Sequence, residues 1–515
     1  MHKSAPFTAP KLKQPTRILF TGCLLTAMAL VAGCSFIPAY QRPAAPVAAD
    51  FPLGDGLATT GAVAASLPWQ QFFTDARLQK LIALAIDNNR DLRVAVLNIE
   101  QARAQYGITR ANQFPTVNGV FSGSRSPSSI PSSAGSSGAS QPGSTSINSL
   151  YTVGLQVTAY ELDFFGRVAS LKEQALAQFL ATEEGRKTTH ISLIAQVANT
   201  YLAVLADEEL LDITRRTLAT REASLKLSKL RFDSGVTSEL DYRQAESLLE
   251  SARFAYAQQQ RQRLLDDNAL TLLVGQPLSA MGPDVLPPST AALPASGTAA
   301  SSALSLAQAQ PMVDVPAGLP SELLASRPDI RQAEQLLLAS NANIGAARAA
   351  FFPKIALTLQ AGTASNQLTK LFDSGTFAWS FAPQLLAPIF DAGRNQAGLY
   401  SAKVQQGIAI AQYEKAIQVA FREVADALAS RATLVAQLRA SQAQVNAETV
   451  RFRLAGLRYD NGVASYLDAL DSQLSLFSVQ QALVQTRLAQ LQSQVTLYKV
   501  LGGGWTDAGP AAAAP

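Results

Sequence analysis

Side chains that commonly carry out catalysis or bind transition metals are scarce in this chain of 515 residues, which contains two histidines and two cysteines. His190 lies in a helical stretch, so a zinc site or a Ser-His-Asp arrangement would have to depend on this residue alone. Gly502 to Gly504 lack the Lys-Ser/Thr pair of a phosphate-binding loop. The sequence therefore predicts a protein that is not an enzyme, with no metal site.

Cys34 is the residue with the clearest chemistry. It ends the segment Val31-Ala32-Gly33-Cys34, which resembles the bacterial lipobox, where the thiol receives a diacylglycerol and the new N-terminus is then acylated. A basic stretch ending at Arg17 and an apolar run over 18–32 precede it, with the length of a signal peptide rather than of a membrane span. We expect residues 1–33 to be a signal peptide and Cys34 to carry lipid. An ordinary signal with an incidental cysteine is the alternative.

Asp468 and Asp471 form the one carboxylate pair with a suggestive spacing. They are three residues apart at the start of a helical segment, so they share a face. Acidic residues in this position commonly stabilise the helix dipole.

Composition and charge bound the class of protein. The chain is 48% apolar and 16% charged, which favours a large buried surface and excludes a disordered chain. Removing the four basic residues of the signal peptide leaves 38 basic and 38 acidic residues. A neutral chain without a run of Lys and Arg argues against nucleic-acid binding.

The chain contains two copies of one unit. Residues 230–241 match 457–468 at an offset of 227, and this register continues to Gly275 and Gly502. Upstream, 91–115 matches 329–353 at an offset of 238, so the first copy carries an insertion of 11 residues. The Ser/Gly/Pro-rich segment 122–149 is the expected place for it.

Each copy contains one very long helical segment. The ranges 167–230 and 394–457 contain no proline, and Ile194, Ala198, Tyr201 and Leu205 follow the spacing of a packed seam. At 1.5 Å per residue each helix would be roughly 96 Å long. We expect such helices to pack side by side into a sheet or a cylinder of helices, and a filamentous coiled coil is the alternative.

Short alternating segments lie between the helices. The ranges 151–159 and 355–362 alternate apolar with small or polar residues, at the period of a strand. Aromatic residues at their ends could form an interfacial girdle. Two hairpins give four strands per chain, whose open edges would be unsatisfied in lipid, so closure requires further copies. Near Pro383 and Pro388 the alternation predicts a bulge or slip.

Taken together, these features resemble a TolC-like outer-membrane factor of the NodT-type lipoprotein branch, which serves resistance-nodulation-division (RND) pumps. The resemblance covers nearly all of the chain after the signal peptide. Its specific parts are 326–334 (Ser-Arg-Pro-Asp-Ile-Arg-Gln-Ala-Glu), the Phe-Pro pairs at 114–115 and 352–353, the segments 165–167 and 392–394, and the two Arg-Phe/Tyr-x-x-Gly turns.

The resemblance implies an α+β membrane protein in which three copies form a 12-stranded β-barrel above a periplasmic α-helical barrel. The segments 122–149 and 362–376 would face outside the cell. The implied partners are a periplasmic adaptor protein, an inner-membrane RND pump and outer-membrane lipid. Ser35, after the lipidated cysteine, implies the outer rather than the inner membrane.

The resemblance also assigns roles to the turns between the long and returning helices, where glycine tolerates positive φ and serine caps the next helix. The implied adaptor-docking residues are Arg231, Gly235, Val236, Leu240, Gly462, Val463 and Leu467, with Arg458 as a further candidate. The implied periplasmic gate is Asp468, Asp471, Arg458 and Tyr459, with the acids closing the mouth through Arg458 or Tyr459.

The expected domain plan follows from these assignments. It consists of a signal peptide (1–33), a lipidated extended segment (34–74), a first repeat (75–275, with hairpin 114–162), an equatorial linker (276–320), a second repeat (321–502, with hairpin 352–390) and a flexible tail (503–515). The favoured function is a passive exit duct for drugs or other toxic compounds. The alternatives are the exit channel of a type I protein secretion system and a structural periplasmic lipoprotein without a pore.

Overall fold

A computed structural model describes residues 35–48, 51, 64–128, 146–278, 306, 312–316, 324 and 326–505. The expected signal peptide, Cys34, most of the linker and most of the tail lie outside these residues. The chain forms two compact units, and each contains parts of both sequence repeats. The first unit comprises the described parts of 1–42, 102–179 and 336–409, and the second comprises those of 43–101, 180–335 and 410–515.

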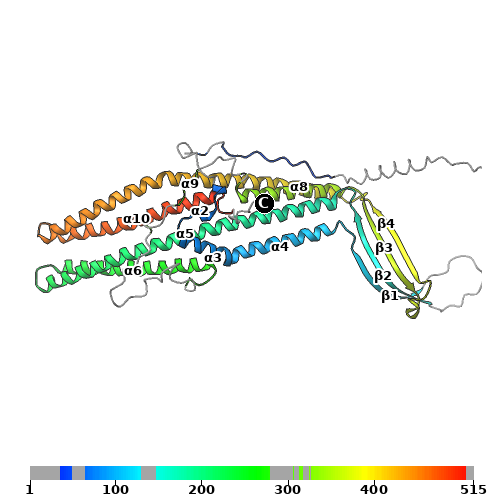
Figure 1. The fold of residues 1–515 in the computed structure, drawn as a ribbon, viewed down its shortest axis with the longest axis horizontal. Coiled ribbons are helices and arrows are strands. Elements are labelled where there is room, and N and C mark those ends of the chain that lie inside the picture. The colour runs from blue at the N-terminus through cyan, green and yellow to red at the C-terminus, as the bar shows by residue number, and fades with distance from the viewer. Residues whose placement is uncertain are drawn as a thin grey trace, which may run out of the picture. The chain divides into compact units, whose positions relative to one another are not determined.

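A four-stranded antiparallel sheet dominates the first unit (Figure 1). Its strands are β1 (Val117–Ser128), β2 (Ser146–Leu162), β3 (Lys354–Ser365) and β4 (Phe377–Leu386), in the order β1-β2-β3-β4. Within the described chain, β1 and β4 therefore each pair on one side only. The sheet has two open edges.

Two expectations for the loops between strands are partly wrong. Residues 122–128 and 146–149 belong to β1 and β2, where Ser122 pairs with Thr152 and their hydroxyls are 2.6 Å apart. Small polar residues were taken for a loop because they carry no apolar alternation, yet the ladder satisfies their backbone groups. In the second hairpin β3 likewise continues to Ser365, and the short helix η4 (Leu368–Lys370) follows.

The bulge expected near Pro383 and Pro388 is also wrong. The register between β3 and β4 is unbroken, with Pro383 opposite Leu357. Proline lacks an N–H but is tolerated on an edge strand, and Pro127 occupies the other edge strand, β1. The irregularity lies in β2 between Val157 and Tyr160, where Ala159 has a φ of 50°.

The segment that follows Cys34 is held against the first unit. The side chains of Asn341 and Arg348, in α8 (Pro328–Ala349), donate hydrogen bonds to the carbonyl oxygens of Pro38 (2.8 Å) and Phe36 (3.1 Å). The Phe36 ring stacks on Phe352, and Phe352 stacks on Phe165, with 4.8 Å between centroids in both pairs. Of the aromatic residues expected in the girdle, Phe352 thus packs on the N-terminal segment, and Phe165 packs on Phe352.

The helices repeat with the sequence. The helix α4 (Arg90–Ala111) matches α8 at an offset of 238, and α5 (Arg167–Asp233) matches α9 (Arg394–Asp460) at an offset of 227. The returning helices α6 (Glu239–Val274) and α10 (Tyr466–Val500) correspond in the same way. The tandem duplication is therefore confirmed. The helices η1 (Ala64–Ser66) and α2 (Trp69–Phe72) precede the first repeat, and α3 (Ala76–Asn88) is its first helix.

The apolar seam of α5 forms the core of the second unit. Ile194, Ala198, Tyr201 and Leu205 are buried as predicted. The hydroxyl of Tyr201 donates to Asp75, which caps α3, and Tyr498 of α10 stacks on Phe72. Of the described helices, α5 has a window long and apolar enough to cross a membrane, but 67% of that window is buried, as in an ordinary core helix.

The start of each repeat is joined to its last helix by the same hydrogen bond. Asn89 donates from Nδ2 to the carbonyl oxygen of Leu273 (2.9 Å), and Arg327 donates from Nη1 to that of Val500 (3.0 Å). Arg327 also binds the carboxylates of Asp329 (2.6 Å) and Glu423 (2.8 Å). The joint is neutral in the first repeat and charged in the second.

Candidate functional site

The turns from α5 to α6 and from α9 to α10 repeat one hydrogen-bond pattern. Gly235 and Gly462 have φ of 72° and 70°, which glycine adopts without steric cost. The N–H groups of the following valines, Val236 and Val463, bind carbonyl oxygens of Arg231 and Arg458, both at 2.8 Å. These contacts close each long helix and direct the chain back.

A serine starts each returning helix. Ser238 accepts from the N–H of Asp241, and Ser465 accepts from the N–H of Asp468, both at 3.2 Å. Each aspartate in turn accepts from the backbone N–H of its serine, which completes a capping box. Asp468 therefore has a structural role, because it stabilises the start of the returning helix.

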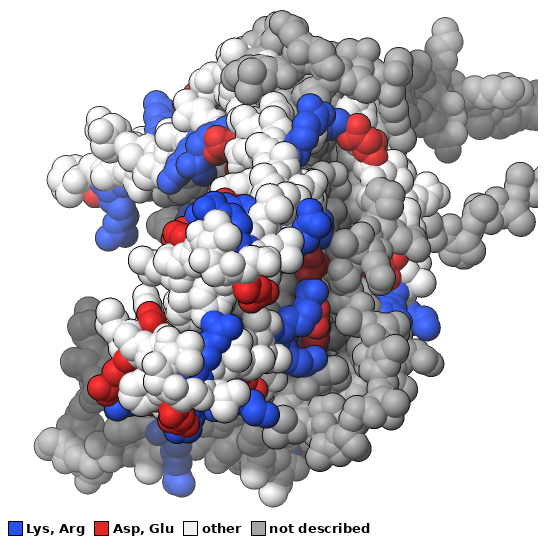
Figure 2. Space-filling view, turned by 90° about the vertical axis from the view of Figure 1, so that its left-hand side faces the viewer, with Lys and Arg blue, Asp and Glu red and all other residues white. Residues whose placement is uncertain are grey.

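Each turn presents an apolar pair to solvent. Val236 and Leu240 are both 75% exposed, and Val463 and Leu467 are 68% and 58% exposed. Figure 2 shows the side of the molecule that carries both turns, where Lys and Arg side chains and Asp and Glu side chains are interspersed with uncharged residues. A partner that fits this surface gains more from apolar contact than from net charge.

Asp471 has a different partner from the one expected. Its carboxylate pairs with Nη2 of Arg451 at 2.5 Å, and Arg451 also pairs with Glu448 at 3.2 Å. Among the described residues Asp471 thus pairs with Arg451 rather than with Arg458, whose side chain is exposed, and Asp468 accepts from the backbone of Ser465. The reason is geometric, because in two antiparallel helices a residue well after the turn faces one that lies well before it.

Tyr459 instead connects the two turns. Nη1 of Arg231 donates to the hydroxyl of Tyr459, and the guanidinium lies over its ring, 5.0 Å from the centroid. Tyr459 also packs on Tyr466 with 5.3 Å between centroids. Arg231 and Tyr459, which the sequence placed in separate docking and gate groups, therefore bind each other.

Arg221 and Tyr466 are neighbours of this bridge that the sequence reasoning missed. Arg221 is 3% exposed, and within the described chain its Nη1 and the Tyr466 hydroxyl have no hydrogen-bond partner. Burial lowers the pKa of Arg221 and raises that of Tyr466. A signal for Arg221 existed, since it lies seven residues from both Thr214 and Ser228, which are buried on the same seam.

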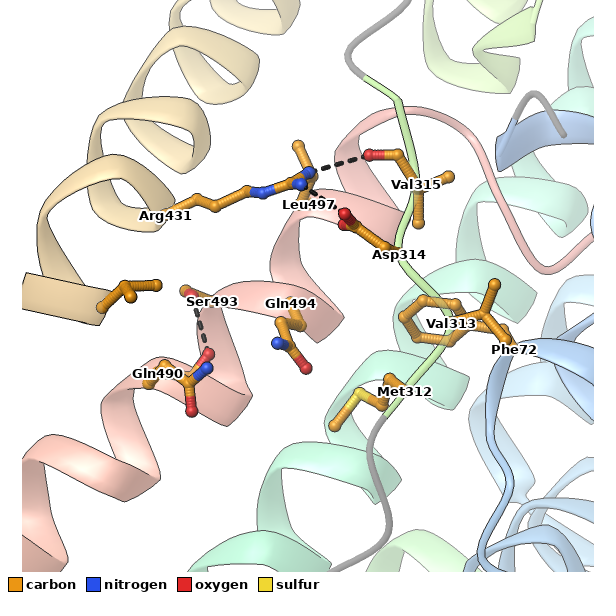
Figure 3. Close-up of a pocket in the computed structure, with 11 residues that line it drawn as sticks. Phe72, Met312, Val313, Asp314, Val315, Arg431, Gln490, Ser493, Gln494 and Leu497 are labelled. Atoms are coloured by element: carbon orange, nitrogen blue, oxygen red, sulfur yellow. Dashed lines mark hydrogen bonds and ion pairs between the residues drawn. The ribbon is translucent and has the colours of Figure 1, made fainter. Parts of the chain in front are cut away.

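A cavity of about 210 Å³ lies beside α10, where part of the linker crosses it (Figure 3). Arg431 of α9 holds this segment by pairing with Asp314 (2.6 Å) and donating to the carbonyl oxygen of Val315 (2.9 Å). The N–H of Val313 donates to the carbonyl oxygen of Phe72. These contacts fasten the linker to the second hairpin.

A family described as "Outer membrane efflux protein" matches residues 81–276 and 319–503. A probable efflux pump outer membrane protein, TtgC of Pseudomonas putida, is 47% identical over 481 residues, covering 93% of this chain and 94% of that protein. Other similar proteins of that species are named for the efflux of antibiotics, toluene and solvents.

The fold is similar to that of solved channels. The open state of the Neisseria gonorrhoeae MtrE outer membrane channel has a TM-score of 0.77 and 40% identity, covering 92% of this chain and 99% of that one. Outer membrane protein OprJ of Pseudomonas aeruginosa is 42% identical over 484 residues, covering 94% and 95% of the two chains.

Proposed function

The chain belongs to the outer membrane efflux protein family, and from this premise we propose that it is the passive exit duct of a tripartite pump that exports drugs and other toxic compounds. The protein is an outer-membrane efflux channel whose helices lie in the periplasm. Its fold is that of the trimeric outer-membrane channels, as predicted. The alternative of a structural periplasmic lipoprotein without a pore is therefore wrong, and the names of the relatives favour efflux over protein secretion.

The open sheet is the observation that carries the proposal. The strands β1 and β4 each leave one edge unpaired within the described chain, and an unpaired edge is not tolerated in lipid. Three copies joined edge to edge give twelve strands, which is enough to enclose a pore. The exposed side chains of Phe121, Phe377 and Trp379 supply the outer surface that lipid would cover.

The turns from α5 to α6 and from α9 to α10 supply the docking surface for the other pump components. The proposed partner is a periplasmic adaptor that contacts Val236 and Leu240 at one turn and Val463 and Leu467 at the other, with an inner-membrane RND pump beyond it. Support comes from the exposure of these four residues and from the repetition of the turn. The two docking surfaces per chain would give six around a trimer.

The lipid anchor remains a proposal because Cys34 lies outside the described residues. Its support is the lipobox and the attachment of the following segment to Asn341 and Arg348. Mass spectrometry of the N-terminal peptide of the purified protein would detect the diacylglycerol and N-acyl groups. An unmodified Cys34 in the purified outer-membrane protein would contradict this assignment.

The acids of the second turn are proposed to restrict the periplasmic mouth. In three copies Asp468 and Asp471 would present six carboxylates, held in place by the capping box and by Arg451. The Arg231–Tyr459 contact would keep the two hairpins of one chain together in the same closed state. Opening would then separate α9 and α10 from the first hairpin.

Single-channel conductance of the purified trimer in planar bilayers tests the duct and its mouth. We expect small cation-selective conductance that rises, with reduced selectivity, in Asp468→Ala/Asp471→Ala. Asp241→Ala is the matched control, because it removes the same capping contact from the first turn but no paired acid. Equal conductance in all three proteins would contradict the acidic mouth. Failure to restore solvent or antibiotic tolerance to cells that lack their own channel would contradict the efflux function.

A further inference from the structure

A buried carboxyl pair joins α5 and α6 in the first helix hairpin. Asp207 of α5 is 5% exposed, and its Oδ1 accepts a hydrogen bond from Gln259 Nε2 at 2.8 Å. Its Oδ2 receives no N–H or hydroxyl donor from the described residues. The carboxyl group of Asp266 lies within hydrogen-bonding reach. A proton between the two carboxyl groups is the donor that this arrangement lacks.

The charges nearby do not neutralise the pair. Arg263, which is 1% exposed, is the cation between the two helices, and it binds Glu208 (2.8 Å) and Asp267. Glu209 of α5 is paired with Arg487 of α10 at 3.2 Å. Asp207 and Asp266 thus face each other while Arg263 is engaged by two other carboxylates.

Two carboxylates in contact away from water cannot both be ionised cheaply. Burial, the hydrogen bond with Asp266 and the charge of that residue together raise the pKa of Asp207 to about 8. Gln259 and Arg263 act in the opposite direction and are outweighed. Asp266 is only partly buried, so water can exchange the proton.

The second hairpin does without such a pair. At the offset of 227, Leu434 replaces Asp207 and Ser493 replaces Asp266, while Gln490 replaces Arg263. Figure 3 shows Gln490 and Ser493 at this level of α10, beside the linker segment. Since the same helix pair packs there without buried acids, the hairpin architecture does not require them.

We propose that Asp207 and Asp266 share one proton in the folded protein and act as a pH-sensitive latch between α5 and α6. With the proton bound, the pair is a hydrogen bond that holds the first hairpin together. When the proton leaves, two facing negative charges weaken the contact of α6 with α5.

The sign of the pH dependence follows from linkage. In the unfolded chain an aspartate loses its proton near pH 4, whereas the folded protein keeps the shared proton to about pH 8. The folded state therefore binds more protons across this window. Stability falls as pH rises through it and levels off above it.

Hydrogen exchange of the full-length trimer, followed by mass spectrometry from pH 5 to 9, tests the latch. After correction for intrinsic exchange, protection of α6 near Gln259 to Asp266 should fall with pH by up to about tenfold per unit. In Asp207→Asn this dependence should disappear, because the amide keeps a hydrogen bond to Asp266 without a proton that titrates. Glu250→Gln, which removes an exposed acid paired with Arg253, is the control and should keep the wild-type dependence.

A spectroscopic measurement covers the case in which the variant folds poorly. The infrared carbonyl band of a protonated carboxyl group should be present in the wild-type trimer at pH 7, should disappear by pH 9 and should be unaffected by a chelator of divalent cations. Protection of α6 that is independent of pH, an absent band, or an unchanged pH dependence in a folded Asp207→Asn protein would each overturn the proposal.

Discussion

The turn from α5 to α6 and the turn from α9 to α10 are closed by the same backbone hydrogen bonds, but the helices behind them place their charges differently. The first hairpin buries Arg221 and Arg263, whereas no charged side chain among the described residues of α9 and α10 is buried, and the pair of Arg451 with Asp471 is exposed. Buried charges fix a contact because an unpaired partner is costly, while exposed ion pairs contribute little. The opening that we propose for the second hairpin would therefore break fewer contacts of buried charges.

The joints between the start of each repeat and its last helix show the opposite distribution of charge. Asn89 makes a neutral hydrogen bond in the first repeat, and the buried Arg327 makes a charged network with two partly exposed carboxylates in the second. A hairpin whose surface contacts are weak is thus anchored strongly where it begins. This combination suits the proposed opening, in which the second hairpin would move while its joint at Arg327 stays in place.

The largest expected effect compares these two joints. Arg327→Ala removes the cation from Asp329 and Glu423, which are 34% and 36% exposed, together with the hydrogen bond to Val500, and should destabilise the protein by about 2 kcal/mol. Asn89→Ala should cost about 1 kcal/mol, because it removes a neutral hydrogen bond. Denaturant unfolding of both variants measures the difference. Equal losses would mean that the charged joint adds nothing to the neutral one.

The contact between the two turns gives the next effect. Tyr459→Phe removes the hydroxyl that accepts from Arg231 but keeps the ring, and should shift the closed state by about 1 kcal/mol, or roughly fivefold in open probability. Channel recordings at fixed voltage measure this ratio. Tyr466→Phe serves as the control, since that hydroxyl has no partner in the described residues. An increase of the same size in the control would assign the effect to the loss of any hydroxyl at this place.

The smallest effect concerns the surface ion pairs. Arg451→Gln in the second hairpin and Arg253→Gln in the first each break exposed pairs and should leave stability nearly unchanged, because water and salt screen such pairs. Arg451→Gln leaves Asp471 without its cation, whereas Arg253→Gln does not affect Asp471. Only Arg451→Gln should therefore increase the cation selectivity of the pore. Reversal potentials in a salt gradient measure selectivity, and a shift in both variants or in neither would contradict a separate role for the second turn.

Features governed by local periodicity were predictable from the sequence. The helix expected over 167–230 extends three residues further, and the glycine and serine of each turn have the conformations expected of them. Contacts between distant residues were not predictable. Arg231 and Tyr459 are 228 positions apart, and Asp207 faces a residue on another helix, so no spacing in the sequence relates them. The extent of β1 and β2 was missed because serine and glycine give a strand no apolar face to recognise.

The prolines of the edge strands bear on assembly. An exposed row of unpaired N–H and C=O groups is a template for indiscriminate pairing, and proline interrupts such a row. Pro127 in β1 and Pro383 in β4 remove one donor from each edge. A pairing between two copies that needs an N–H donor at Pro127 or at Pro383 is therefore less stable than one that does not. Before the barrel closes, the same two residues discourage the chain from aggregating through its sheet, and they narrow the ways in which one copy can join the next.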